Sequence, residues 1–206
     1  MKRTIVLISF LTLLLSSIFA KPIAYGINIS DKITDLAKMG CMITQNSEGL
    51  MLVEIEEGKK SLEDKLIKNF YIGFNDSDII AIALEYVDSS KYEDILGIIE
   101  RDHGKGMRGA EIENYTKKYK KEPSDEEAIK LLFSGQLFDY ITSFAIAQIA
   151  IELEEDDEIK DLTLWTKNDM SIFLTISDEN EISSFFINTK EILDLMNSET
   201  LKNLTH

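Results

Sequence analysis

Residues Arg101 to Gly109 (RDHGKGMRG) are the stretch whose residue types could do chemistry. His103, Lys105 and Arg108 stand among glycines there, in a chain whose formal net charge is −15. Basic side chains and the backbone N–H groups of a glycine-rich turn are what a bound anion needs. We therefore predict that His103, Lys105 and Arg108 are the candidates for an anion contact.

The glycines at 104, 106 and 109 also spell G-x-G-x-x-G, the fingerprint of a dinucleotide site. That fingerprint requires a strand directly before it, so that the backbone can approach a pyrophosphate at the next helix N-terminus. Here a capping box at 90–93 opens a segment with helical period that continues to about Arg101. No cofactor is therefore expected, and a glycine-rich basic connector at 104–109 is the alternative to an anion contact.

A hydrolase would have to use His103, the one histidine away from the C-terminus, as its general base. Nucleophilic catalysis needs a serine or cysteine beside the base and an acid that orients it. The chain has no Gly-x-Ser-x-Gly elbow, and nothing in the sequence places Cys41, the sole cysteine, near His103. No catalytic residue is predicted, and a hydrolase using His103 and carboxylates stays an alternative.

Acidic residues are densest just before the last predicted strands. Calcium binds oxygen ligands, but no acidic run fits the EF-hand loop. Zinc sites draw on several His, Cys or carboxylate ligands, so no metal is expected. We expect Trp165 to share one strand face with Phe173, Phe185 and Ile187, either in the core or as an exposed patch. The candidate partner-binding residues are Glu152, Glu154, Glu155, Asp156, Asp157 and Trp165.

Residues 1–20 have the build of a secretory signal peptide. Lys2 and Arg3 form a positive n-region, an apolar run follows at 5–15, and small residues lead to a predicted cut after Ala20. The run is short for a spanning helix, and no later stretch is long enough to cross a membrane. We expect an exported protein, periplasmic or secreted.

The acidic balance limits the partners. Nucleic acid and anionic lipid should repel this chain, whereas a basic protein should be attracted to it. A single cysteine allows no internal disulfide, so the exported domain must rely on its core, which a hydrophobic content of 44% permits. Cys41 itself is expected to be a small buried residue.

Short helices and antiparallel hairpins alternate along the chain. This pattern predicts an α+β fold, an antiparallel sheet or meander with short helices on one face, as one domain or as two small modules in tandem. The parts are a module at 21–103, the connector at 104–109, and a helical pair plus meander at 110–206. The expected strands lie at 42–44, 50–55, 70–74, 79–87, 142–154, 162–166, 171–176 and 182–187. The alternative for 142–154 is that its start extends the helix before it. Helices are expected after Ser30, Ser61, Ser90, Gly109, Ser124 and Thr189.

The opening Ala24-Tyr25-Gly26-Ile27-Asn28-Ile29, followed by a helix that ends at Met39-Gly40, resembles a group of small, exported, uncharacterised bacterial proteins. These begin with an aromatic-Gly-Ile strand, a short helix and a glycine. The resemblance covers residues 24–56 only. It implies no catalytic residue and no function.

Acidity, small size and the lack of a catalytic set favour a non-enzymatic binding protein. We expect an exported inhibitor or immunity-type protein for a basic protein partner. The alternatives are the periplasmic hydrolase and an envelope structural or assembly factor. An inhibitor should expose an acidic or aromatic patch, a hydrolase should place His103 in a cleft, and an assembly factor should show an open sheet edge or apolar groove.

Overall fold

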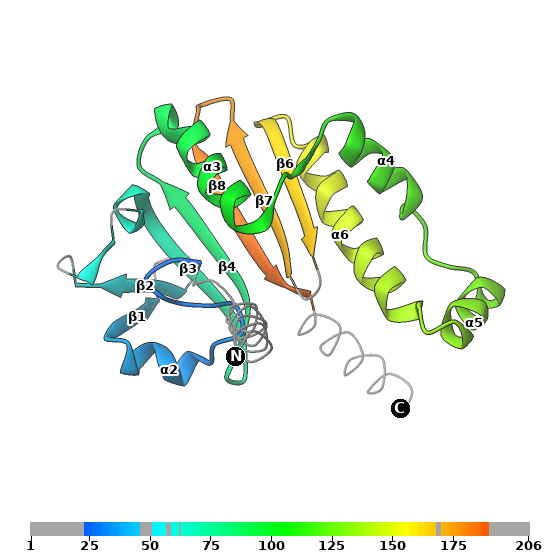
Figure 1. The fold of residues 1–206 in the computed structure, drawn as a ribbon, viewed down its shortest axis with the longest axis horizontal. Helices are drawn as coiled ribbons and strands as arrows, with labels where there is room; N and C mark the ends of the chain where they lie inside the picture. The colour runs from blue at the N-terminus through cyan, green and yellow to red at the C-terminus, as the bar shows by residue number, and fades with distance from the viewer. Residues whose placement is uncertain (1–22, 46–50, 57–58, 62, 168–169, 190–206) are drawn as a thin grey trace, which may run out of the picture.

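A computed structural model of the chain describes residues 23–45, 51–56, 59–61, 63–167 and 170–189 (Figure 1). The first half supplies four strands, each antiparallel to the next. They are β1 (Cys41–Gln45), β2 (Met51–Ile55), β3 (Ile67–Asn75) and β4 (Asp78–Tyr86). The hairpin predicted at 70–74 and 79–87 is confirmed as β3 and β4.

The second half supplies β5 (Met107–Arg108), β6 (Ile159–Lys167), β7 (Met170–Ser177) and β8 (Ile182–Asn188). The last three form the predicted meander. Strand β8 also pairs with β4, with Ile82 opposite Phe186. The strand order among the described residues is therefore β1-β2-β3-β4-β8-β7-β6-β5. The α+β fold is confirmed, and its two halves share one sheet instead of forming separate modules.

The described helices are α2 (Ile33–Lys38), α3 (Tyr92–His103), α4 (Ala110–Lys118), α5 (Asp125–Phe133) and α6 (Leu137–Glu155), with short 3-10 turns η2 (Asp64–Leu66) and η3 (Ser89–Lys91). Helix α2 precedes β1, and the other described helices lie in the connections between strands. The helix expected from Ser61 shortens to η2. Across the described ranges, no helix has both the length and the apolar character needed to cross a membrane. The predicted signal peptide and the helix predicted after Thr189 lie outside the described residues.

The sheet carries a core on each face. On one face Trp165 and Phe186 pack with Ile95 and Ile99 of α3 and with the N-terminal segment. On the other face, the residues of β6 to β8 pack with Ile112 of α4 and with α6. Neighbouring residues of a strand point to opposite faces, which allows β6 to serve both cores. Figure 1 shows α3 lying across the sheet and α6 alongside β6. Helices thus cover both faces of the sheet, and the prediction placed them on one.

Residues 142–154 belong to α6, so the strand predicted there is wrong. This helix carries apolar residues on all of its faces, so its sequence lacks the single apolar stripe of period 3.6 that would have identified a helix. Its isoleucine and threonine residues are β-branched, and such residues are typical of strands. Packing explains the outcome, because Ile146, Ala147 and Ala150 are buried. Tertiary contacts, more than local propensity, stabilise such a helix.

Residues 23–27 fold into a tight turn, where the resemblance of residues 24–56 implied a strand. The φ angles of Tyr25 and Gly26 are 52° and 77°. The N–H of Ile27 donates to the carbonyl of Ala24 at 2.7 Å, and the N–H of Ile23 donates to the carbonyl of Ile27 at 2.7 Å. Glycine adopts such positive φ angles without steric cost. The turn buries Ala24 and Ile27 against the α3-side core.

Candidate functional site

The glycine segment at 104–109 joins the sheet edge. Helix α3 ends at His103, and Gly104 follows with φ 81°, donating its N–H to the carbonyl of Glu100 at 2.8 Å. Met107 and Arg108 then form β5, opposite Leu164 and Thr163 of β6. Residues 104–109, predicted to be a connector, thus include a two-residue edge strand of the sheet.

Gly106 fixes how closely this segment approaches β6. It is buried, and a Cβ atom placed on it would lie 2.5 Å from Cγ2 of Thr163 and 2.6 Å from the Trp165 ring. No side chain fits at such distances without displacing its neighbours. The indole Nε1 of Trp165 donates a hydrogen bond to the carbonyl of Gly104 at 2.7 Å. The glycine at position 106 thus has a packing reason that requires no phosphate.

The three residues predicted to hold an anion lie in different surroundings. Lys105 is exposed and His103 is half-buried at the end of α3. Arg108 turns toward β6, where its Nε donates to Oγ1 of Thr163 at 2.9 Å. Its Nη2 is buried with no hydrogen-bond partner among the described residues. Arg108 therefore contributes to the packing of β5 on β6, and the anion contact stays a prediction.

The predicted acidic surface lies at the C-terminal end of α6 and in the turn before β6. All five of its carboxylates are exposed: Glu152, Glu154, Glu155, Asp156 and Asp157. Burial and the nearby charge of Glu113 on α4 raise the pKa of Glu154. Within the described ranges, no three His, Cys, Asp or Glu side chains are grouped so that they could hold a metal ion. These carboxylates form an open surface on which a partner could rest.

Trp165 does not belong to that surface. It is 4% exposed and lies on the α3 face, where the register places it opposite Ile172. Phe173 pairs with Leu164 and packs on the α4 and α6 side. The prediction that Trp165 and Phe173 share a face is therefore wrong, because the two residues have opposite parity in the paired strands. Phe173, Phe185 and Ile187 do share a face, and Trp165 is a core residue.

The sequence did not single out an exposed apolar surface at the α5–α6 turn. We call it the apolar tip and define it by Ile129, Leu132, Phe133 and Phe138, of which Phe133 is 87% exposed. Helix α5 has no buried residue at all. The signal was present in the spacing, because the apolar residues of α5 spread over an arc of about 200° at 100° per residue, twice the width of an ordinary core-facing stripe. An apolar arc that wide on a short helix predicts that part of it is left uncovered.

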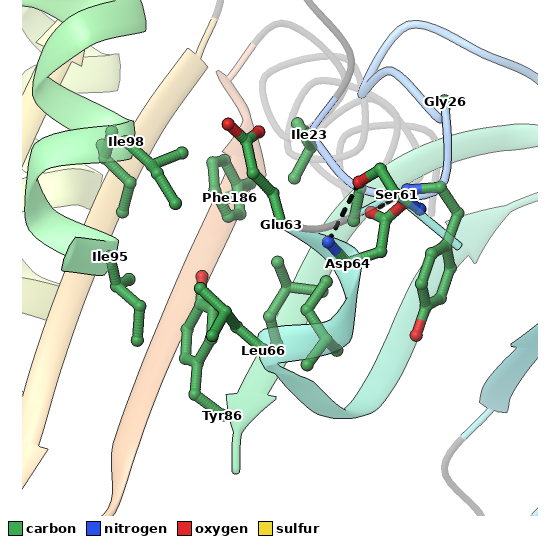
Figure 2. Close-up of a pocket in the computed structure, with 15 residues that line it drawn as sticks. Ile23, Gly26, Ser61, Glu63, Asp64, Leu66, Tyr86, Ile95, Ile98 and Phe186 are labelled. Atoms are coloured by element: carbon green, nitrogen blue, oxygen red, sulfur yellow. Dashed lines mark hydrogen bonds between the residues drawn. The ribbon is translucent and has the colours of Figure 1, made fainter. Parts of the chain in front are cut away.

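A cavity of about 290 Å³ lies between α3, η2 and the N-terminal turn, over strands β3, β4 and β8. Figure 2 shows that Ile95 and Ile98 of α3, Leu66 and Phe186 line it together with a few polar groups. Tyr86 is one of these. Its hydroxyl is hydrogen-bonded to the Ser184 hydroxyl at 2.8 Å, and burial raises its pKa to about 12. The cavity therefore combines apolar walls with several polar side chains, which include Tyr86, Glu63 and Asp64.

His103 is not among the residues that line this cavity. The cavity thus does not provide the cleft that the hydrolase prediction requires. Comparison with protein-family models, with curated proteins and with solved structures finds no match to this chain. The resemblance expected for residues 24–56 accordingly stays a prediction, and the function has to be argued from the geometry alone.

Proposed function

We propose that this chain is an exported acidic binding protein that holds a basic protein partner through the apolar tip of α5 and α6. An inhibitor or immunity-type role is the form of this proposal that small size and acidity favour. The single observation that carries it is the exposure of the apolar tip. Export itself is inferred from the n-region, apolar run and small residues at 1–20.

The apolar tip has the composition of a contact surface. Single exposed apolar residues are ordinary, but grouped ones mark interaction sites. Phe133 and Phe138 come from the end of one helix and the start of the next, on either side of the turn that contains Gly135, and both side chains are exposed. Aromatic anchors inserted into a partner's pocket supply much of the binding energy in protein interfaces.

Charge decides which partner fits. Helix α5 exposes Asp125, Glu126 and Glu127, and its Lys130 is paired with Glu126 at 2.7 Å. Asp139 follows Phe138 directly. A second copy of this chain also has a net charge of −15, so repulsion between the two copies disfavours self-association. Interfacial membrane helices are rich in Lys and Arg on their polar face, whereas α5 carries three acidic residues and one lysine, Lys130. A basic protein with an apolar pocket satisfies both features.

The test compares binding by the full chain with binding by a double variant, Phe133→Ser/Phe138→Ser. The native chain is immobilised, an envelope extract of the producing cell is applied, and captured protein is eluted with a salt gradient. We expect a basic protein that elutes as salt increases, because screening weakens attraction between exposed charges. The double variant should lose that capture.

A matched control removes two exposed apolar residues elsewhere. Met42 and Val87 are 63% and 55% exposed and lie outside the tip, so Met42→Ser/Val87→Ser should retain the capture. Equal loss in both double variants would contradict the proposal, because general stickiness would then explain the binding. Capture of an acidic protein would contradict the predicted charge of the partner.

A further inference from the structure

The cavity under α3 is a site that the apolar tip does not use. Its apolar walls come from four parts of the chain: the N-terminal turn, η2, the sheet and α3. An engineered apolar cavity of about 150 Å³ binds benzene, so a cavity of about 290 Å³ has room for roughly a dozen non-hydrogen atoms. Its size is close to the lower end of ordinary ligand pockets.

Asp64 forms the polar end of the cavity. Its side chain is 7% exposed, and one carboxylate oxygen accepts from the N–H of Tyr25 at 2.8 Å while the other accepts from the N–H of Ser61 at 2.8 Å. These bonds fix the carboxylate and stabilise the N-terminal turn. A carboxylate has about four lone-pair sites, so each oxygen keeps room for one more donor. Asp64 is thus a preorganised acceptor beside apolar walls.

Glu63 lies at the rim of the cavity and, like Asp64, carries a negative charge. Its Oε1 accepts from Nη1 of Arg101 on α3 at 2.9 Å, and Nη2 of Arg101 binds Asp102 at 2.9 Å. The guanidinium of Arg101 is therefore already held by two carboxylates. Among the described residues that line the cavity, the charged side chains are Glu63 and Asp64, and both are acidic. An anionic head group would be repelled here, and a cationic one would be attracted.

We propose that this cavity binds a small cationic amphiphile, with an ammonium group donating to Asp64 and an aliphatic body lying against Leu66, Ile98 and Phe186. Apolar burial supplies the attraction for the body. The buried Asp64 carboxylate orients the head group of the ligand and favours a positively charged one. The site is independent of the proposed partner surface, because the apolar tip contributes no residue to the cavity.

The test measures binding of three ligands of equal chain length to the full chain by calorimetry: octylamine, octanol and octanoate. We expect octylamine to bind at least about tenfold more tightly than octanol, the size of effect that a hydrogen bond to a buried charged group produces. Octanoate should bind more weakly than octanol. Binding of octanoate as tight as that of octylamine would overturn the proposal.

Variants locate the site. Ile98→Trp fills the cavity from a half-buried position and should abolish octylamine binding, whereas Gly97→Ala on the same helix meets open space and should not change it. Glu63→Gln, at an exposed pair, should weaken binding about two- to fivefold. Asp64→Asn is not used, because it would also remove the hydrogen bonds that stabilise the N-terminal turn. The other three variants test the location of the site. Unchanged binding by Ile98→Trp would overturn the assignment.

The Phe133→Ser/Phe138→Ser variant separates this proposal from the partner proposal. It should bind octylamine with the native affinity while losing protein capture. Loss of octylamine binding in that variant would place the amine at the apolar tip and overturn the cavity assignment.

Discussion

The indole Nε1 of Trp165 donates a hydrogen bond to the carbonyl of Gly104 at 2.7 Å, and this bond holds the glycine segment against the sheet. The two residues are 61 positions apart in sequence. Trp165 is buried in the α3-side core, and Gly104 is the residue that follows the last residue of α3. The bond satisfies a polar group of the tryptophan ring that burial would otherwise leave unpaired. Gly106 therefore allows the chain before β5 to approach β6, while Gly104 and Gly109 adopt positive φ angles of 81° and 47°.

Gly106→Ala should destabilise the fold. Its Cβ atom would contact Thr163 and the Trp165 ring at under 3 Å, so the edge strand would have to move away from β6. Overpacking of this kind costs about 1–3 kcal/mol in the free energy of unfolding. Urea unfolding followed by the fluorescence of Trp165, the one tryptophan of the chain, measures it.

Gly97→Ala is the matched control. Gly97 is exposed within α3 and a Cβ atom there meets nothing within 4 Å, so the substitution should stabilise the fold by about 0.5–1 kcal/mol. Equal effects of the two substitutions would show that the contact with Trp165 is not what restricts position 106.

Arg108→Ala and Lys105→Ala should differ, although both remove a basic residue from the same segment. Arg108 donates to Thr163 and is half-buried, so its loss should lower the free energy of unfolding by about 1–2 kcal/mol. Lys105 is exposed, and its loss should change stability by less than about 0.5 kcal/mol. Thermal unfolding of both variants checks this. A larger loss for Lys105→Ala would contradict the placement of Arg108 against β6.

Alkaline pH should destabilise the fold through Tyr86. Burial raises its pKa from 10 to about 12, so the unfolded chain releases the proton first. The stabilisation is therefore fully present below about pH 10 and is lost as the pH rises toward about 12. Urea unfolding from about pH 8 to pH 11 measures the slope. Tyr86→Phe should flatten it, and an unchanged slope would assign the effect to other groups.

Regular patterning made much of the fold predictable. Alternating residues identified β4 and the meander, and the capping residue Ser124 marked the start of α5, where its N–H donates to the Glu127 carboxylate at 3.0 Å. Helix α6 could not be predicted, because it is apolar on all sides and periodicity then carries no signal. The pairing of β4 with β8 is a contact between distant segments, and no local pattern encodes it.

The candidate site was less predictable than the fold. The acidic residues were identified as exposed from their density alone, and Cys41 is buried as expected, with a pKa raised by burial. The face of Trp165 depends on strand register, which a slip of one residue reverses. The cavity depends on how η2, the N-terminal turn and α3 meet, so residues such as Asp64 and Ile98 gave no advance signal.

Photo-crosslinking from position 133 tests the central claim most directly. A benzophenone amino acid in place of Phe133 keeps an aromatic group at the most exposed point of the apolar tip, and the same group in place of Val87 serves as the control. We predict that irradiation in the producing cell joins position 133 to one basic protein, and that Phe138→Ser reduces the yield. Identical products from positions 133 and 87, or no product from position 133, would contradict the claim that the apolar tip binds a basic partner.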